Sequence, residues 1–501
     1  MRPASRDAPP VAPVVALGAV SVLGTSWFAW SLPAAPSRRT RAGAALAEDV
    51  GPWRWAYDHL APPSSSALAA SLVAVAAVMF VAWAGAIAVT WRRSSPARVR
   101  AIVWCVGLAC AVSVLALPTH SSDIYDYALF GRVASDNGGE PYHDLPDAYP
   151  DDPLYRYSSH QYTGHPDNKL PVWTMAATGV TALAGDHPIA VVLALRGLLA
   201  TATLLATVLV ARIAHRLRPD GAAAAAAVFG LCPVTLTYGG AKTDALMVLL
   251  MLVGLALVAD DRSRAGTALT TLAVMVKAIA APVLALVVLA PSAPERHGRA
   301  RRATDVVVRA ALAGVVVVAV YLPFRDPVGL ARAHLAEPDQ TSAASLATPV
   351  ALVALAVVAG GVVGWAWRQR PASALERAEV VVTASAPLLV LFAATLTRPG
   401  LPWYLLTPLA VVALARSVPL LMVLGALAAT SFLMGWWESI DTRAHPLPEV
   451  HGSRTSLYLL VAGVAGVSAL VAWAARRRAA ADRPPGRERR STAAAAVGPS
   501  G

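Results

Sequence analysis

Charged residues are scarce in this 501-residue chain. They make up 14% of it, whereas 56% is hydrophobic and the mean hydropathy is +0.54. A soluble domain of this size carries roughly 25% charged residues. The composition therefore excludes an ordinary water-soluble enzyme and predicts an all-α integral membrane protein, a polytopic bundle of helices.

Cysteine and lysine are scarce as well. Cys105, Cys110 and Cys232 lie in apolar segments without a CxxC spacing, so neither a disulfide framework nor a zinc site is expected. Lys and Arg together number 42, yet only three are lysines, a bias typical of a high-GC genome. The net charge of +12 indicates membrane topology and attraction to lipid surfaces rather than nucleic-acid binding.

Long apolar runs are present throughout. About twenty apolar residues cross a bilayer, and about twelve crossings are expected, at residues 11–32, 67–91, 101–118, 187–211, 221–238, 244–259, 304–323, 345–367, 379–396, 402–415, 417–436 and 455–475. The first is interpreted as a retained anchor rather than a cleaved signal peptide, because it is long for one. The membrane domain thus covers 11–475, between a short cytoplasmic tail (1–10) and a disordered, Arg-rich cytoplasmic tail (476–501).

The arginine clusters predict the orientation of these crossings. By the positive-inside rule the loops rich in Arg are cytoplasmic, as are both termini, in the plasma membrane. Residues 265–291 are apolar too, but a crossing there would place the arginines of 296–302 outside. We therefore expect a re-entrant segment that turns near Lys277 to Pro282 and lies buried in protein.

Residues 119–170, the loop after the third crossing, differ from the rest of the chain. They contain nine acidic and three basic residues, four histidines and seven of the twelve tyrosines. Their charge and their position predict an external loop, and a loop of this length is usually functional or disordered. Its tyrosines favour a packed, functional loop.

Two carboxylates open this loop. Asp123 and Asp126 lie one helical turn apart if the segment is helical. A carboxylate at this position can take the proton of an acceptor hydroxyl, and Asp123 is the preferred catalytic base with Asp126 as its rival. The alternative interpretation is that Ser122 or Asp123 caps a short helix.

Aromatic residues of the loop suit a sugar ring. Tyr125, Tyr127, Tyr162 and His165 are candidate substrate-binding residues, although an aromatic belt at the membrane interface would also explain the tyrosines. A divalent metal held by the histidines at 120, 143, 160 and 165 together with the acids is an alternative, but their spacing matches no defined ligand set. No cofactor is predicted.

Charges at membrane depth are functional candidates, because burying them there is costly. Arg196 lies within the fourth crossing, Lys242 and Asp244 within a short external turn, and Lys277 within the re-entrant segment. None of the three lysines lies among the cytoplasmic arginines, which indicates that a compact ammonium is required where they stand. Structural ion pairs, including one between Lys242 and Asp244, are the alternative.

Taken together, these motifs resemble the polyprenyl-phosphomannose-dependent α-1,6-mannosyltransferases of actinobacteria, membrane glycosyltransferases of the GT-C class. The resemblance covers roughly residues 70–420. It rests on Ser122-x-x-Tyr125-x-Tyr127 with Asp123, Tyr162 to Pro166 before Trp173, Arg196, the Gly240 to Asp244 turn, Lys277, and Pro402-Trp403-Tyr404. The chain departs from the family pattern where Lys242-Thr243-Asp244 replaces an expected His-Asn-Asp.

The resemblance implies a GT-C-like bundle whose external loop holds the catalytic site. The enzyme would be an inverting hexosyltransferase that moves mannose from a lipid-phosphate donor to a glycan or lipoglycan acceptor, as in lipomannan biosynthesis in the cell envelope. Arg196, Lys242 and Lys277 would bind the donor phosphate, and Asp244, Trp403 and Tyr404 would bind substrate. Three alternatives remain: a transferase of another sugar such as arabinose or glucose, a transporter or flippase of lipid-linked sugars, and a structural partner.

Overall fold

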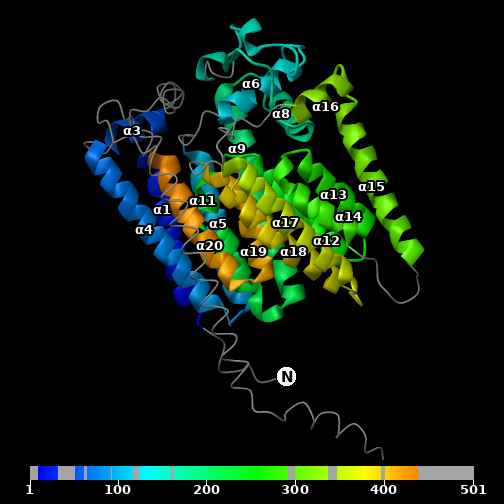
Figure 1. The fold of residues 1–501 in the computed structure, drawn as a ribbon. Helices are drawn as coiled ribbons and strands as arrows, with labels where there is room; N and C mark the ends of the chain where they lie inside the picture. Colours follow the sequence, from blue (N-terminus) through cyan, green and yellow to red (C-terminus); the bar gives the residue numbers. More distant parts are fainter. Residues whose placement is uncertain are drawn as a thin grey trace, which may run out of the picture.

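The computed structural model describes residues 10–31, 51–60, 65–91, 93–116, 123–158, 163–290, 299–336, 347–369, 371–395 and 401–437. Within these ranges every regular element is a helix. Figure 1 shows most of the helices side by side in one bundle, with α6, α8 and α16 gathered at one end of it. The prediction of an all-α membrane protein is confirmed at this level.

Seven of the described helices are long and apolar enough to cross a bilayer. They are α1 (Ala12–Ser31), α4 (Ser65–Thr90), α5 (Pro96–Leu115), α9 (Pro188–Leu217), α15 (Arg299–Tyr321), α18 (Ala374–Thr395) and α20 (Val418–Trp437). Shorter apolar helices lie among them, so the prediction of about twelve crossings is not confirmed. The crossing expected at 455–475 and the tail at 476–501 lie outside the described residues.

The remaining elements fill the bundle or lie at its ends. They are α3 (Gly51–His59), α6 (Asp123–Ser135), η1 (Pro146–Ala148), η2 (Tyr155–Tyr157), α8 (Pro171–Ala184), η3 (Pro219–Gly221), α10 (Ala222–Gly230), α11 (Pro233–Tyr238), α12 (Asp244–Ala259), α13 (Ser263–Val274), η4 (Ala278–Ala280), α14 (Ala281–Leu289), α16 (Pro327–Ala336), α17 (Ala347–Arg368), η5 (Pro402–Leu405) and α19 (Leu406–Ala415).

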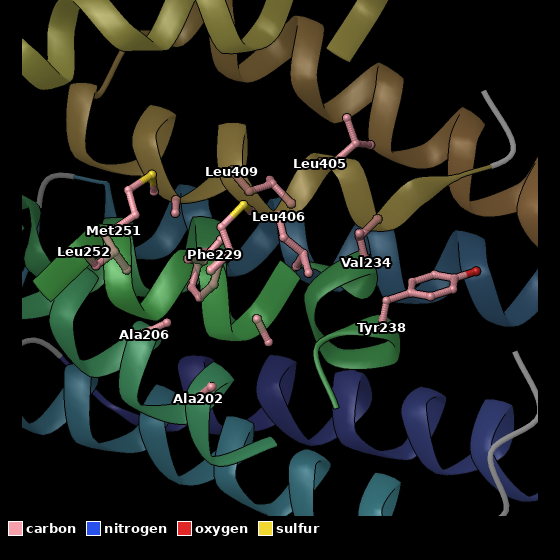
Figure 2. Packing of buried hydrophobic residues seen from close by; sticks show 14 of the residues in the cluster. Ala202, Ala206, Phe229, Val234, Tyr238, Met251, Leu252, Leu405, Leu406 and Leu409 are labelled. Carbon is pink, nitrogen blue, oxygen red and sulfur yellow. The ribbon is translucent and has the colours of Figure 1, made fainter. Parts of the chain in front are cut away.

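The core lies where α9, α10, α12 and α19 meet. Figure 2 shows Ala202 and Ala206 of α9, Phe229 of α10, Met251 of α12 and Leu409 of α19 in this cluster. All residues of α10 are buried, and six of the nine are alanines. Helices that are apolar all round belong inside a bundle or in lipid, and small side chains let their backbones approach closely.

Residues predicted to form one crossing at 221–238 form two helices instead. α10 ends at Gly230, and α11 starts at Pro233, whose ring and missing N–H prevent one helix from continuing through it. The pair directs the chain toward the turn at 239–243, which carries Lys242.

The segment expected to be re-entrant also forms a pair of helices. α13 and α14 meet at a turn with Lys277, and α13 packs along α12 for much of its length. Lys277 therefore returns to the start of α12, at Asp244. Whether this pair crosses the membrane stays a prediction.

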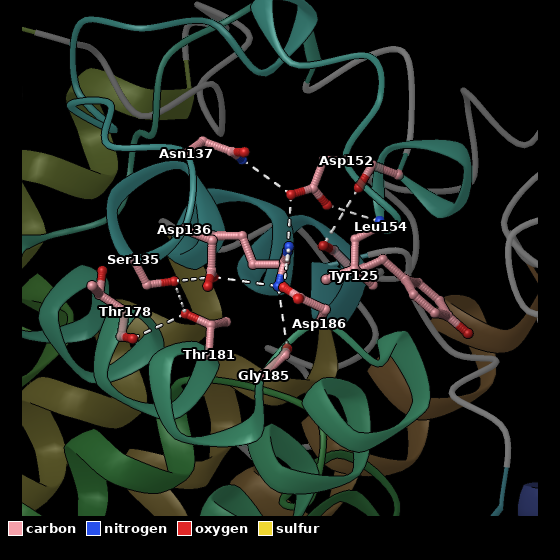
Figure 3. A network of polar contacts seen from close by, with 12 residues as sticks. Tyr125, Ser135, Asp136, Asn137, Asp152, Leu154, Thr178, Thr181, Gly185 and Asp186 are labelled. Atoms are coloured by element: carbon pink, nitrogen blue, oxygen red, sulfur yellow. Dashed lines mark hydrogen bonds and ion pairs between the residues drawn. The ribbon is translucent and has the colours of Figure 1, made fainter.

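The described part of the loop after α5 is held in place by Arg132, the last-turn arginine of α6. Its guanidinium bonds Asp152 at 2.8 Å, Asp186 at 3.1 Å and the carbonyl of Gly185, which ends α8, at 3.2 Å. Figure 3 shows this network, in which the amide of Asn137 also donates to Asp152. A guanidinium has five donors in a fixed planar arrangement, which suits a position with several acceptors. The buried cation of Arg132 thus ties this part of the loop to α8.

At the opposite end of the bundle, arginines bond the last carbonyls of neighbouring helices. These arginine caps are Arg98 on Val89 (2.9 Å), Arg216 on Ala259 (3.1 Å), Arg218 on Ala415 (3.3 Å), Arg309 on Val287 and Ala290 (both 2.8 Å) and Arg416 on Trp91. The last carbonyls of a helix have no partner within it. The arginine caps supply one from another part of the chain.

Candidate functional site

Asp123 is the first residue of α6 and the first member of a cluster of charges. Its Oδ2 accepts a hydrogen bond from Lys242 Nζ at 2.5 Å and one from the Tyr127 hydroxyl at 3.3 Å. Tyr127 lies one turn further along α6, and its ring packs edge-on against Trp173 with centroids 4.8 Å apart. Because Trp173 of α8 is buried, the start of α6 is fixed from both sides.

Lys242 lies in the turn between α11 and α12. This turn lies close to α9, since a Cβ on Gly239 would come within 2.5 Å of Thr203 Oγ1 and of the Thr235 carbonyl. Only glycine fits such a contact. The lysine side chain is 1% exposed, so its ammonium is directed into the protein, toward Asp123.

Asp244 begins α12 and pairs with Lys277. Lys277 Nζ donates to both carboxylate oxygens of Asp244, at 3.0 and 2.8 Å. Asp244 is 1% exposed, like Lys242. The ion pair considered from the sequence, between Lys242 and Asp244, is replaced by two pairs with partners far away in the chain.

Two aromatic rings of η5 cover the two ammonium groups. Lys242 Nζ lies 3.7 Å from the ring centroid of Trp403, and Lys277 Nζ lies 3.9 Å from that of Tyr404. A cation over an aromatic face is attracted by its quadrupole, by about 2 kcal/mol when both are desolvated. The two rings stack on each other at 26°, which keeps their faces in line with the lysines.

The site is thus a cluster of four alternating charges, the charge cluster: Asp123, Lys242, Asp244 and Lys277. Burial lowers the pKa of Lys242 and outweighs the attraction of Asp123. Burial acts on Lys277 in the same direction, but the charge of Asp244 outweighs it and raises the pKa of Lys277. The formal charges of the charge cluster sum to zero when all four groups are ionised.

Arg196, expected to bind the donor phosphate, makes its described contacts outside the charge cluster. It is fully buried in α9, and its guanidinium donates to the carbonyls of Val114 and Ala116 at the end of α5. It also interacts with Tyr125, which is fully buried and whose hydroxyl has no hydrogen-bond partner in the described part of the chain. Arg196 therefore holds the end of α5 just before the segment that leads to α6.

The other candidates from the sequence make no described contact with the charge cluster. Asp126 is 4% exposed in α6, and His165 is exposed. Tyr162 lies outside the described residues, as do two of the four histidines considered for a metal. Within the described ranges, no group of three or more His, Cys, Asp or Glu side chains is placed to hold a metal ion.

Comparison with known proteins places the chain in a family. The family model described as "Alpha-(1->6)-mannopyranosyltransferase, N-terminal domain" matches residues 15–293, more than half of the chain. The chain belongs to this mannosyltransferase family. The matched residues include all four members of the charge cluster, whereas Trp403 and Tyr404 lie beyond them.

A relative of this family is Alpha-(1->6)-mannopyranosyltransferase A of Mycobacterium tuberculosis. It is 31% identical over 216 residues, which cover 41% of this chain and 38% of the relative. The match therefore spans less than half of the relative. No solved structure matches the chain.

Proposed function

We propose that this chain is a polyprenyl-phosphomannose-dependent α-1,6-mannosyltransferase. It transfers a mannosyl residue from a lipid-phosphate donor to a glycan or lipoglycan acceptor at the outer face of the membrane. The observation that carries the proposal is the charge cluster, where a partly exposed carboxylate and a partly exposed ammonium lie at the end of the bundle next to the acidic loop. Membership of the mannosyltransferase family supports the sugar and the linkage.

The chemistry needs one base and at least one cation. The donor phosphate leaves as an ionised group, so no general acid is needed, but its developing charge must be stabilised. Lys277, whose side chain is 23% exposed, takes this role. Asp123, equally exposed, takes the proton of the acceptor hydroxyl.

A single displacement inverts the sugar. Attack by the activated hydroxyl on a β-linked donor, opposite to the departing phosphate, gives an α-linked product. We assign the rings of Trp403, Tyr404 and Tyr127 to the substrate side of the charge cluster. No cofactor is part of the proposal, because the ammonium of Lys277 supplies the positive charge that the leaving phosphate needs.

The test is transfer by membranes that contain the chain. Membranes with and without it are incubated with labelled polyprenyl-phosphomannose and a lipid-linked mannan acceptor, and the product is digested with an α-1,6-specific mannosidase. We expect the label to enter the mannan and the mannosidase to release it again as free mannose. Transfer only from the arabinose or glucose donor would change the sugar, and movement of intact donor across the bilayer without transfer would show a flippase.

A further inference from the structure

The four charges of the charge cluster differ in their exposure. The side chains of Asp123 and Lys277 are each 23% exposed, whereas those of Lys242 and Asp244 are each 1% exposed. Each ion pair thus has one outer and one inner member, of opposite sign in the two pairs. Substrates can reach one carboxylate and one ammonium, and the inner groups lie behind them.

We propose that the inner groups are positioning residues for the outer ones: Lys242 keeps Asp123 ionised, and Asp244 holds Lys277 for the donor phosphate. The proposal rests on the function proposed above and deepens it. In this proposal Asp123 contacts the acceptor and Lys277 contacts the donor. Lys242 and Asp244 contact neither and act through Asp123 and Lys277.

Lys242 is suited to keeping a carboxylate charged. Its ammonium lies 2.5 Å from Asp123 Oδ2, and a cation at such a distance favours the ionised carboxylate by one to three pKa units. In the described part of the chain, the hydroxyl of Tyr127 also donates a hydrogen bond to Asp123, and the charge of Lys277 is attractive at longer range. Lys242 makes the shortest of these contacts.

Asp244 is suited to fixing an ammonium. Both of its oxygens accept from Lys277 Nζ, and the ring of Tyr404 covers another side of the same group. Lys277 lies in a turn and not within a helix, so its direction depends on these contacts. Asp244 holds the Lys277 ammonium in one position before the donor binds. Less conformational entropy of the lysine is then lost on binding.

The arrangement explains why a lysine stands at position 242 in a chain with only three lysines among its 42 basic residues. A guanidinium is a planar fork that bonds two acceptors side by side, and the arginine caps use it in that way. The ammonium of Lys242 fits between one carboxylate oxygen and a ring face 3.7 Å away. A compact point charge meets that geometry.

The experiment compares Lys242→Met with Asp244→Asn in the purified full chain. For Lys242→Met we expect the acid limb of the kcat/KM profile to move up by at least one pH unit. Its activity loss is then large at pH 6 and shrinks toward pH 9, while binding of farnesyl phosphate stays within about threefold of the parent. For Asp244→Asn we expect the limb unmoved and farnesyl phosphate bound at least tenfold more weakly.

The controls separate this inference from folding and from the proposed function. Lys277→Met should weaken binding of farnesyl phosphate as Asp244→Asn does, and a melting curve checks the fold of each variant. An unmoved limb in Lys242→Met, or unchanged phosphate binding in Asp244→Asn, overturns the division into inner and outer groups. A parent chain without transfer refutes the proposed function instead, and binding of farnesyl phosphate still tests Asp244. If Lys242→Met does not fold, Asp244→Asn decides alone.

Discussion

Asp123 and Asp126 stand three residues apart in the first turn of α6 but have different surroundings. The side chain of Asp123 is partly exposed and bonded to Lys242, whereas Asp126 is 4% exposed within the packed face of α6. A general base must reach the proton that it takes. The exposure of Asp123 therefore favours it over Asp126 for this role.

Replacing each carboxylate by its amide tests this choice. Asp123→Asn keeps the shape of the side chain but cannot take a proton, so we expect kcat to fall by about 10²–10⁴-fold, the usual contribution of a general base. Asp126→Asn should keep kcat within about tenfold. The measurement is turnover in detergent at saturating donor; a dead Asp126→Asn beside an active Asp123→Asn would exchange the two roles.

At this scale the sequence predicted the members of the site better than their partners. The rarity of lysine singled out Lys242 and Lys277, and the acidic start of the loop singled out Asp123. The ion pairs could not be predicted from the sequence. Lys242 and Asp244 are close in the chain, but the turn before α12 points their side chains toward different partners, Asp123 and Lys277. The position of Arg196 in an apolar run predicted only that its buried charge needs partners. In the structure these partners are backbone carbonyls.

Among the elements, α12 and α13 pack closely against each other. A Cβ on Gly254 would come within 2.4 Å of Thr270 Oγ1 and 2.9 Å of the Gly266 carbonyl. α12 carries Asp244 and α13 leads to Lys277, so this contact joins the two helices that hold the ion pair. Small residues at such a crossing let helix backbones meet.

Gly254→Ala should push the two helices apart. Overpacking of this kind costs about 1–3 kcal/mol, so we expect a lower melting temperature in detergent together with weaker donor binding. Gly197→Ala is the matched control, because it lies within α9 and an added Cβ there meets nothing within 4 Å. Equal melting temperatures for the two variants would contradict the close contact.

The apolar runs of the sequence predicted the presence of helices but not how many cross the membrane. A run such as 244–259 has the same composition whether lipid or protein surrounds it. In the structure α12 is among the most buried helices, and the run at 221–238 is broken at Pro233. Burial among neighbours depends on the whole arrangement, which no single segment encodes.

For the whole molecule, the two ends of the bundle carry different charges. The arginine caps bond the ends of α12, α14 and α19. The charge cluster lies at the starts of α6 and α12, at the other end of the bundle, where Figure 1 shows α6 and α8. Short loops rich in arginine remain in the cytoplasm. The proposed orientation therefore puts the charge cluster at the outer face.

Labelling of single cysteines in a variant without Cys105, Cys110 and Cys232 tests this orientation. Arg93→Cys and Asp151→Cys place thiols at exposed positions at the two ends. In intact cells, a reagent that cannot cross the membrane should label position 151 and leave position 93 unlabelled until the cells are opened. Labelling at position 93 alone would reverse the orientation.

The bond from Arg416 to the Trp91 carbonyl joins residues 325 positions apart in the chain. At a synthesis rate of roughly 5–20 residues per second, this carbonyl waits on the order of 15–65 s for its partner. The end of α4 must be satisfied by water or lipid headgroups during that interval. Arg98 lies only nine residues after Val89, so it can bond the Val89 carbonyl of α4 soon after α4 has been synthesised. The end of α4 thus gains the local Arg98 first, and the distant Arg416 only after α19 has been made.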